Sequence, residues 1–124
     1  MNSASLILLS LASAQGAPAK LEHVAVIATA APGSEIISVQ AATKRAALTH
    51  SQTGQIELFD LTDPAKPRSM KVFDLLLEKG EEITSVALPP SGDWFIAVVK
   101  SGRKLAPGRA LVHSLADGSR LASL

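Results

Sequence analysis

A five-residue segment occurs twice in this chain of 124 residues, and this repetition constrains the fold more than any other feature. Glu35–Val39 reads EIISV and Glu82–Val86 reads EITSV, so the second copy starts 47 residues after the first (82 − 35 = 47). A period of about 40 to 50 residues is typical of β-propeller blades, each of which buries its faces against its neighbours. The repeat therefore predicts two structural units.

Each unit contains short apolar segments separated by turn sequences, and no segment keeps a period of 3.6 residues over three helical turns. A leading strand is predicted at Val24–Ala30. Four strands follow in each unit: Ile36–Gln40, Arg45–Thr49, Gln55–Leu61 and Ser69–Leu75, then Ile83–Leu88, Trp94–Lys100, Arg109–Leu115 and Arg120–Leu124. The expected fold class is all-β, a β-propeller fragment of about two four-stranded blades plus the leading strand.

The N-terminus resembles a secretory signal peptide. An apolar run, Leu6–Leu11, is followed by Ala12-Ser13-Ala14, a small-x-small pattern that signal peptidase accepts, so cleavage is expected after Ala14. The run is much shorter than the roughly 20 apolar residues that span a bilayer, which argues against a transmembrane helix. An uncleaved hydrophobic N-terminus or a wrongly assigned start codon is the alternative. The expected organisation is a signal peptide (1–14), an entry segment with the leading strand (15–34), blade 1 (35–81) and blade 2 (82–124), together an incomplete domain.

Composition excludes several kinds of function. A formal net charge of +1 gives no electrostatic basis for binding nucleic acid. The absence of cysteine excludes disulfides and thiolate zinc sites, and the three histidines are too far apart in sequence to predict a transition-metal site. Nucleotide-binding, hydrolase and zinc-protease motifs are absent as well.

Two glutamates are the candidate metal ligands, because the repeat gives Glu35 and Glu82 equivalent positions before the first strand of each blade. Equivalent positions in successive blades face a common axis. Carboxylates brought together there repel unless a cation intervenes, and calcium, which prefers oxygen ligands, is the candidate cofactor. The alternative is that each glutamate accepts backbone hydrogen bonds from the neighbouring blade.

Other polar and aromatic residues have ordinary structural explanations. Asp60 and Asp63 are expected to cap their own turn. His50 and His113 are expected at the surface or at a sheet edge, and Trp94 is expected in the core between blades. The basic loop Lys100–Arg109 is interpreted as a solvated hairpin, with contact to an acidic partner as the alternative.

The chain also resembles a known family over roughly Leu21–Leu124. The Glu35-Ile36 strand opening, the DLTDPAKP corner at Asp60–Pro67 and the SVA segment at Ser85–Ala87 are similar to the start of the choice-of-anchor I domain. That family consists of bacterial extracytoplasmic β-propellers, also found in cell-surface glycoproteins, that are related to YVTN and LVIVD repeat propellers. Its members are longer and carry a C-terminal anchor, so the resemblance implies an N-terminal fragment.

These observations lead to one expected function and two alternatives. The expectation is a secreted, periplasmic or cell-surface propeller that acts as a non-catalytic binding scaffold. Its partners would be the remaining blades or a cell-surface polymer or protein. The first alternative is part of a calcium-dependent propeller hydrolase, similar to phytases or lactonases, and the second is a truncated product without independent function.

Overall fold

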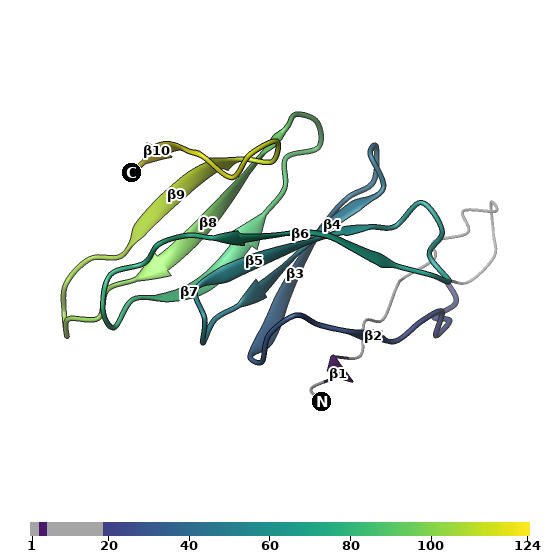
Figure 1. Cartoon of the computed structure of the whole chain (residues 1–124), viewed down its shortest axis with the longest axis horizontal. Helices are drawn as coiled ribbons and strands as arrows, with labels where there is room; N and C mark the ends of the chain where they lie inside the picture. The colour runs from purple at the N-terminus through teal and green to yellow at the C-terminus, as the bar shows by residue number, and fades with distance from the viewer. Residues whose placement is uncertain (1–2, 5–18) are drawn as a thin grey trace.

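The computed structural model describes residues 3–4 and 19–124, and all regular structure within them is β-strand. Two four-stranded antiparallel sheets form, in which each strand pairs with the strand that precedes or follows it in the chain (Figure 1). The first sheet contains β3 (Ser34–Gln40), β4 (Arg45–His50), β5 (Gln55–Asp60) and β6 (Arg68–Asp74). The second contains β7 (Glu82–Ala87), β8 (Trp94–Lys100), β9 (Arg109–Ser114) and β10 (Arg120–Ser123).

The all-β class is confirmed, the eight predicted strands form two four-stranded sheets, and the bounds of all eight agree with the prediction to within two residues. The leading strand is shorter than expected, since only β2 (Ile27–Ala28) is a strand, paired with β1 (Ser3–Ala4). Apart from Ser3–Ala4, the predicted signal peptide at 1–14 lies outside the described residues. No helix in the described part of the chain is long and apolar enough to cross a membrane.

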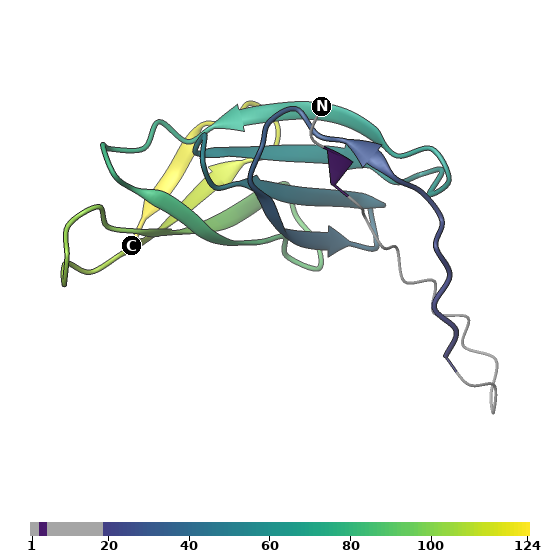
Figure 2. The same ribbon diagram turned by 90° about the horizontal axis from the view of Figure 1, so that it is seen from below.

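The two sheets stack face to face, as seen in Figure 2, and share one apolar core. Strands β3 and β4 of the first sheet lie against β7 of the second. The rings of Phe73 and Phe95 meet in this core with their centroids 5.5 Å apart. The buried residues of the shared core are Ala47, Ile56, Leu58, Phe73 and Leu75 from the first unit and Ile83, Val86, Leu88, Phe95, Ala97 and Leu115 from the second.

Hydrogen bonds between the units reinforce this packing. The amide of Gln40 donates to the carbonyl of Pro89 at 2.7 Å, and the backbone N–H of Leu88 donates to the hydroxyl of Ser38 at 2.9 Å. The β9–β10 turn also reaches the first sheet. Gly118 adopts φ +75° there, and a Cβ added to it would lie 2.6 Å from a ring carbon of Phe73. The second unit is therefore fixed against the first.

The first sheet is covered on both faces. Its second face carries a smaller core, to which β2 contributes Ile27 and the sheet contributes Ala46, Leu48, Phe59 and Leu61. Adjacent Ala46 and Ala47 are both buried because they point to opposite covered faces.

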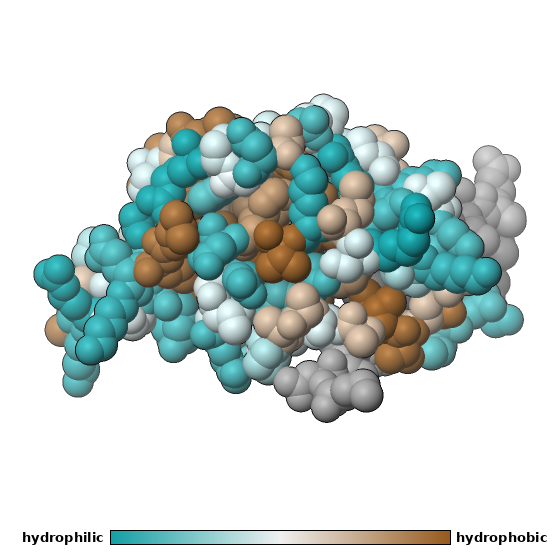
Figure 3. All heavy atoms as spheres, in the orientation of Figure 1, coloured by the Kyte–Doolittle hydropathy of each residue, from teal (hydrophilic) through white to brown (hydrophobic). Residues whose placement is uncertain are grey.

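The second sheet is covered on one face. Along β8, Phe95, Ala97 and Val99 are buried, whereas Trp94 and Val98 point the other way and are exposed. Nothing in the described residues packs on the far face of β8. Trp94, expected in a core between blades, is 39% exposed. Figure 3 shows other apolar side chains scattered among hydrophilic ones on the face turned to the viewer.

Candidate functional site

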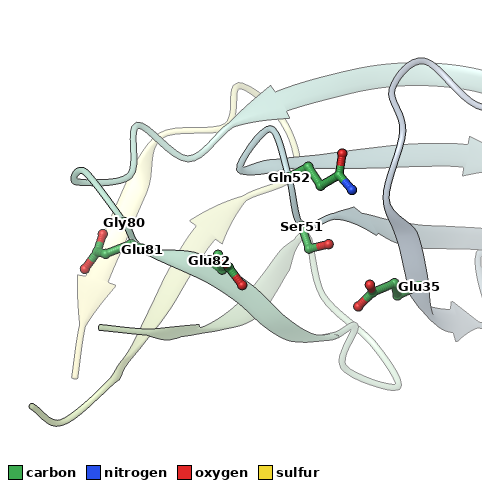
Figure 4. Close-up of a pocket in the computed structure, with 6 residues that line it drawn as sticks. All are labelled: Glu35, Ser51, Gln52, Gly80, Glu81 and Glu82. Carbon is green, nitrogen blue, oxygen red and sulfur yellow. The ribbon is translucent and has the colours of Figure 1, made fainter. Parts of the chain in front are cut away.

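The repeated glutamates border one cavity between the two sheets. This inter-sheet cavity measures about 560 Å³ and is lined by Glu35, Ser51, Gln52, Gly80, Glu81 and Glu82. Glu35 comes from β3 and Glu82 from β7, and Figure 4 shows both side chains reaching toward the same space. The structure thus brings together the two residues that the repeat singled out.

Two of the three carboxylates at the cavity already have cationic partners. The Arg109 guanidinium donates from Nε and Nη2 to the two oxygens of Glu81, at 3.0 and 2.8 Å. These hydrogen bonds lower the pKa of Glu81 and raise the pKa of Arg109. Lys100 Nζ lies 2.7 Å from a carboxylate oxygen of Glu82, in a pair that is half exposed to solvent.

A cation in the cavity would therefore be bound by the carboxylates of Glu35 and Glu82, of which Glu82 is also paired with Lys100. Calcium binds oxygen donors and completes its shell with carbonyls and water, so two carboxylates are a partial ligand set. Among residues 3–4 and 19–124, no group of three or more His, Cys, Asp or Glu side chains is arranged to hold a metal ion. The carboxylates here fit a weak, partly hydrated calcium ion better than a dehydrated transition metal.

A second polar cluster, the Glu57 network, lies buried in the first sheet. Glu57 Oε2 accepts hydrogen bonds from His50 Nε2 at 2.7 Å and from the backbone N–H of Ala30 at 2.9 Å. Glu57 Oε1 accepts from the hydroxyl of Ser69 at 2.6 Å. The Ser34 hydroxyl lies 2.9 Å from His50 Nδ1. Both His50 and Glu57 are fully buried, so this carboxylate has its donors supplied by the protein.

The order of groups in this network is that of a serine nucleophile, its base and an orienting carboxylate. His50 bridges the other two groups, with Nε2 bonded to the Glu57 carboxylate and Nδ1 to the Ser34 hydroxyl. The imidazole is closed off from solvent, however, and its bonds join the segment 30–34 to β4, β5 and β6. The arrangement acts as a clamp that holds the chain entry on the first sheet.

The sequence-based placement of both histidines is wrong. His50 is buried by the Glu57 network, and His113 is buried against Phe95, whose ring stacks on it with centroids 5.4 Å apart. His113 Nδ1 donates to the carbonyl of Gly118 at 2.9 Å, while its buried Nε2 has no hydrogen-bond partner among the described residues. Both side chains lie on sheet faces that tertiary packing covers.

The predicted turn capping at the DLTDPAKP corner is confirmed. Asp60 Oδ1 accepts from the hydroxyl and the backbone N–H of Thr62, at 2.6 and 2.9 Å, and its other oxygen accepts from Arg68 at 2.9 Å. The hydrogen bonds from Thr62, aided by Arg68, lower the pKa of Asp60 to about 2. Asp63 accepts from the backbone N–H of Ala65 at 3.1 Å. These aspartates stabilise the corner.

Comparison of this sequence with models of protein families and with curated proteins found no match.

Proposed function

We propose that this chain is part of an exported β-propeller that serves as a non-catalytic binding scaffold, similar to choice-of-anchor I domains. One observation carries the proposal. The two units have the same meander order, stack face to face, and place their first strands, β3 and β7, next to each other. In a propeller the first strand of every blade lies nearest the central axis, so adjacent first strands are the arrangement expected of consecutive blades.

The polar groups support a scaffold more than an enzyme. Glu81 and Glu82 contact Arg109 and Lys100, and His50 is committed to the Glu57 network. A general base must reach a substrate proton at hydrogen-bond distance, which a fully buried imidazole does not do. The partners of such a scaffold would be the remaining blades and a cell-surface polymer or protein.

A second candidate function is part of a calcium-dependent hydrolase, and the shared cavity of Glu35 and Glu82 favours it. A calcium ion held there would polarise a phosphoester or lactone oxygen as a Lewis acid. This chain would supply two of the carboxylates, and further units would supply the rest.

Two measurements on the whole chain separate these candidates. The scaffold proposal expects saturable co-sedimentation of the purified protein with isolated bacterial cell-wall polymer, and no calcium-dependent turnover of a phosphoester or a lactone. Turnover that needs calcium and is lost in a Glu35→Gln variant would favour the hydrolase. Failure of both binding and turnover would leave the truncated product as the better explanation.

Export is tested separately. Protein recovered from outside the cytoplasm should begin at Gln15, because the peptidase site ends at Ala14. Recovery of intact Met1 from the cytoplasm alone would contradict export. The nucleotide sequence that follows the Leu124 codon tests the propeller directly, since a propeller requires further units with a period near 47 residues.

A further inference from the structure

The loop between β8 and β9 is longer than its counterpart in the first unit. β8 ends at Lys100 and β9 starts at Arg109, which leaves eight residues between them (109 − 100 − 1 = 8). The equivalent loop between β4 and β5 lies between His50 and Gln55 and has four (55 − 50 − 1 = 4). Four residues close the hairpin in the first unit, so the second unit carries four more than this connection needs. In Figures 1 and 2 the β8–β9 loop projects past the ends of its strands.

The far end of this loop is a defined turn. The backbone N–H of Ala106 donates to the carbonyl of Arg103 at 3.3 Å, which closes a four-residue turn with Lys104 and Leu105 in the middle. Leu105 has φ +64°, and the third position of such a turn normally takes glycine or asparagine. At the base of the loop, a Cβ added to Gly102 would lie 2.7 Å from a backbone carbon of the β6–β7 loop. The two loops are therefore packed directly on each other.

The turn presents an exposed leucine between cations, and we call the segment Arg103–Leu105 the basic tip. Leu105 is 97% exposed, the largest fraction among the exposed large apolar residues of the described chain. Arg103 and Lys104 are exposed as well, and no salt bridge among the described residues involves either of them. A leucine in a backbone conformation that favours glycine, surrounded by water, adds nothing to the stability of this fold. Its place in the turn therefore points to a contact outside the chain.

A following unit of a propeller would leave this loop open. The internal repeat supplies the comparison, because the second unit packs on the first sheet while Gln52 and Thr53, in the middle of the β4–β5 loop, stay exposed. A neighbouring unit covers the face of a sheet, whereas the loops at the strand ends remain at the surface. Exposure of the basic tip is therefore compatible with further units of the chain.

We propose that the basic tip docks on an anionic lipid surface. Leu105 enters the boundary between headgroups and acyl chains and leaves water there, and the two cations beside it contact headgroup phosphates. The attraction is local, since the formal net charge of the whole chain is only +1. A soluble anionic polymer would satisfy the two cations but would offer no apolar surface to the leucine. Docking needs no other unit of the chain and is independent of the scaffold function.

Co-sedimentation of the full chain with lipid vesicles measures this docking. The parent protein should bind vesicles made of phosphatidylglycerol and phosphatidylcholine in equal parts, and should not bind vesicles of phosphatidylcholine alone. Leu105→Gly should weaken binding about tenfold, because it removes the side chain that enters the lipid. Arg103→Gln and Lys104→Gln should each weaken it about fivefold, which corresponds to about 1 kcal/mol per basic residue near the surface. Added salt should weaken binding of the parent protein.

Leu76→Gly is the matched control. Leu76 is also a leucine with positive φ (+51°) and is 78% exposed, but it lies between Asp74 and Glu78 in the chain. An anionic surface repels these carboxylates, so this variant should bind vesicles as the parent protein does. Both leucine variants place glycine where its conformation is favoured, so neither change threatens the fold.

A fluorescent label gives a second readout that keeps Leu105 in place. The chain has no cysteine, so Ala106→Cys can be labelled with a dye that is sensitive to its environment. Its emission should shift to shorter wavelength when anionic vesicles are added. The same label on Ala65→Cys, in the corner between β5 and β6, should show no shift, because that corner joins the opposite ends of its strands.

Several results would overturn the proposal. They are a parent protein that does not bind anionic vesicles, binding that Leu105→Gly leaves unchanged, and an equal loss of binding in Leu76→Gly. Binding to inorganic polyphosphate as strong as to the vesicles, and equal in Leu105→Gly, would assign the basic tip to a soluble polymer and would also overturn it. The cell-wall binding assay is a separate test of the scaffold, so the two proposals can fail independently.

Discussion

Replacing Glu57 by leucine tests whether the buried network holds the first sheet together. The substitution removes the acceptor of His50, and a buried N–H left without a partner costs about 1 to 3 kcal/mol. The two lost bonds from Ala30 and Ser69 cost about 1 kcal/mol each, because both residues are exposed enough for water to replace the carboxylate. Burial of the apolar leucine side chain offsets about 1 kcal/mol of this loss of unfolding free energy. The expected loss of unfolding free energy is about 3 kcal/mol.

Urea unfolding followed by circular dichroism measures this loss. With a slope of about 2 kcal/mol per molar urea, the midpoint should fall by about 1.5 M. The Glu57→Gln variant keeps one acceptor oxygen, so its unfolding free energy should fall by only about 1 kcal/mol. Glu82→Leu serves as the surface control and should cost less than about 1 kcal/mol, because its pair with Lys100 is half exposed. A Glu57→Leu variant as stable as the parent protein would refute the clamp.

Three further predictions concern the cavity, the corner and the β9–β10 turn. Calorimetric titration should detect calcium binding to the parent protein, weak because the ligand set is partial, and a Glu35→Gln, Glu82→Gln double variant should lose it. The Asp60 carboxyl should titrate near its pKa of about 2, below the ordinary 3.8, because Thr62 donates to it. Its stabilising effect is then complete above about pH 4 and is lost as the pH falls through about 2. Gly118→Ala should lower stability by more than about 1 kcal/mol, because it combines a φ of +75° with a clash against the phenylalanine ring of β6.

Each of these predictions has a contrary result. Equal calcium binding by the parent protein and the double variant, or none by either, would make Glu35 and Glu82 structural residues. A carboxyl resonance of Asp60 with an ordinary midpoint in an NMR titration would contradict the capping argument. Gly54, which also has positive φ but whose added Cβ would approach the Leu77 side chain no closer than 3.1 Å, is the control for Gly118. Equal losses at the two glycines would show that strain, and not the clash, sets the cost.

The strands were predictable because each is bounded by turn residues and repeats with the same period. Trp94–Lys100 begins and ends at the predicted residues, and the turn sequences Pro89–Asp93 and Asp117-Gly118 fall between strands. The shared cavity of Glu35 and Glu82 followed from the repeat as well. Local sequence and periodicity contain this information, since every ladder joins neighbouring strands.

The Glu57 network was not predictable in the same way. Ser34, His50 and Glu57 are brought together by the register of β3, β4 and β5, and the burial of His50 depends on the packing of a whole sheet. One signal was present, because Glu57 interrupts the apolar strand Ile56–Phe59. A carboxylate at such a position must find buried donors, and the nearest histidine in sequence was the natural partner to consider. Trp94 was predicted to be buried between blades, but the described residues contain no surface that packs over it.

The strand order also has a kinetic consequence. Every strand of the first sheet pairs with a neighbour in sequence, so its hydrogen-bond ladders can close once the chain has been synthesised or translocated as far as Asp74. Such local topology favours rapid folding. Until β7 and β8 arrive, however, the face that carries Ile56 and Leu58 stays open to water. A nascent chain held at that length presents an apolar sheet to chaperones and to other nascent copies, and this interval is when misassembly would start.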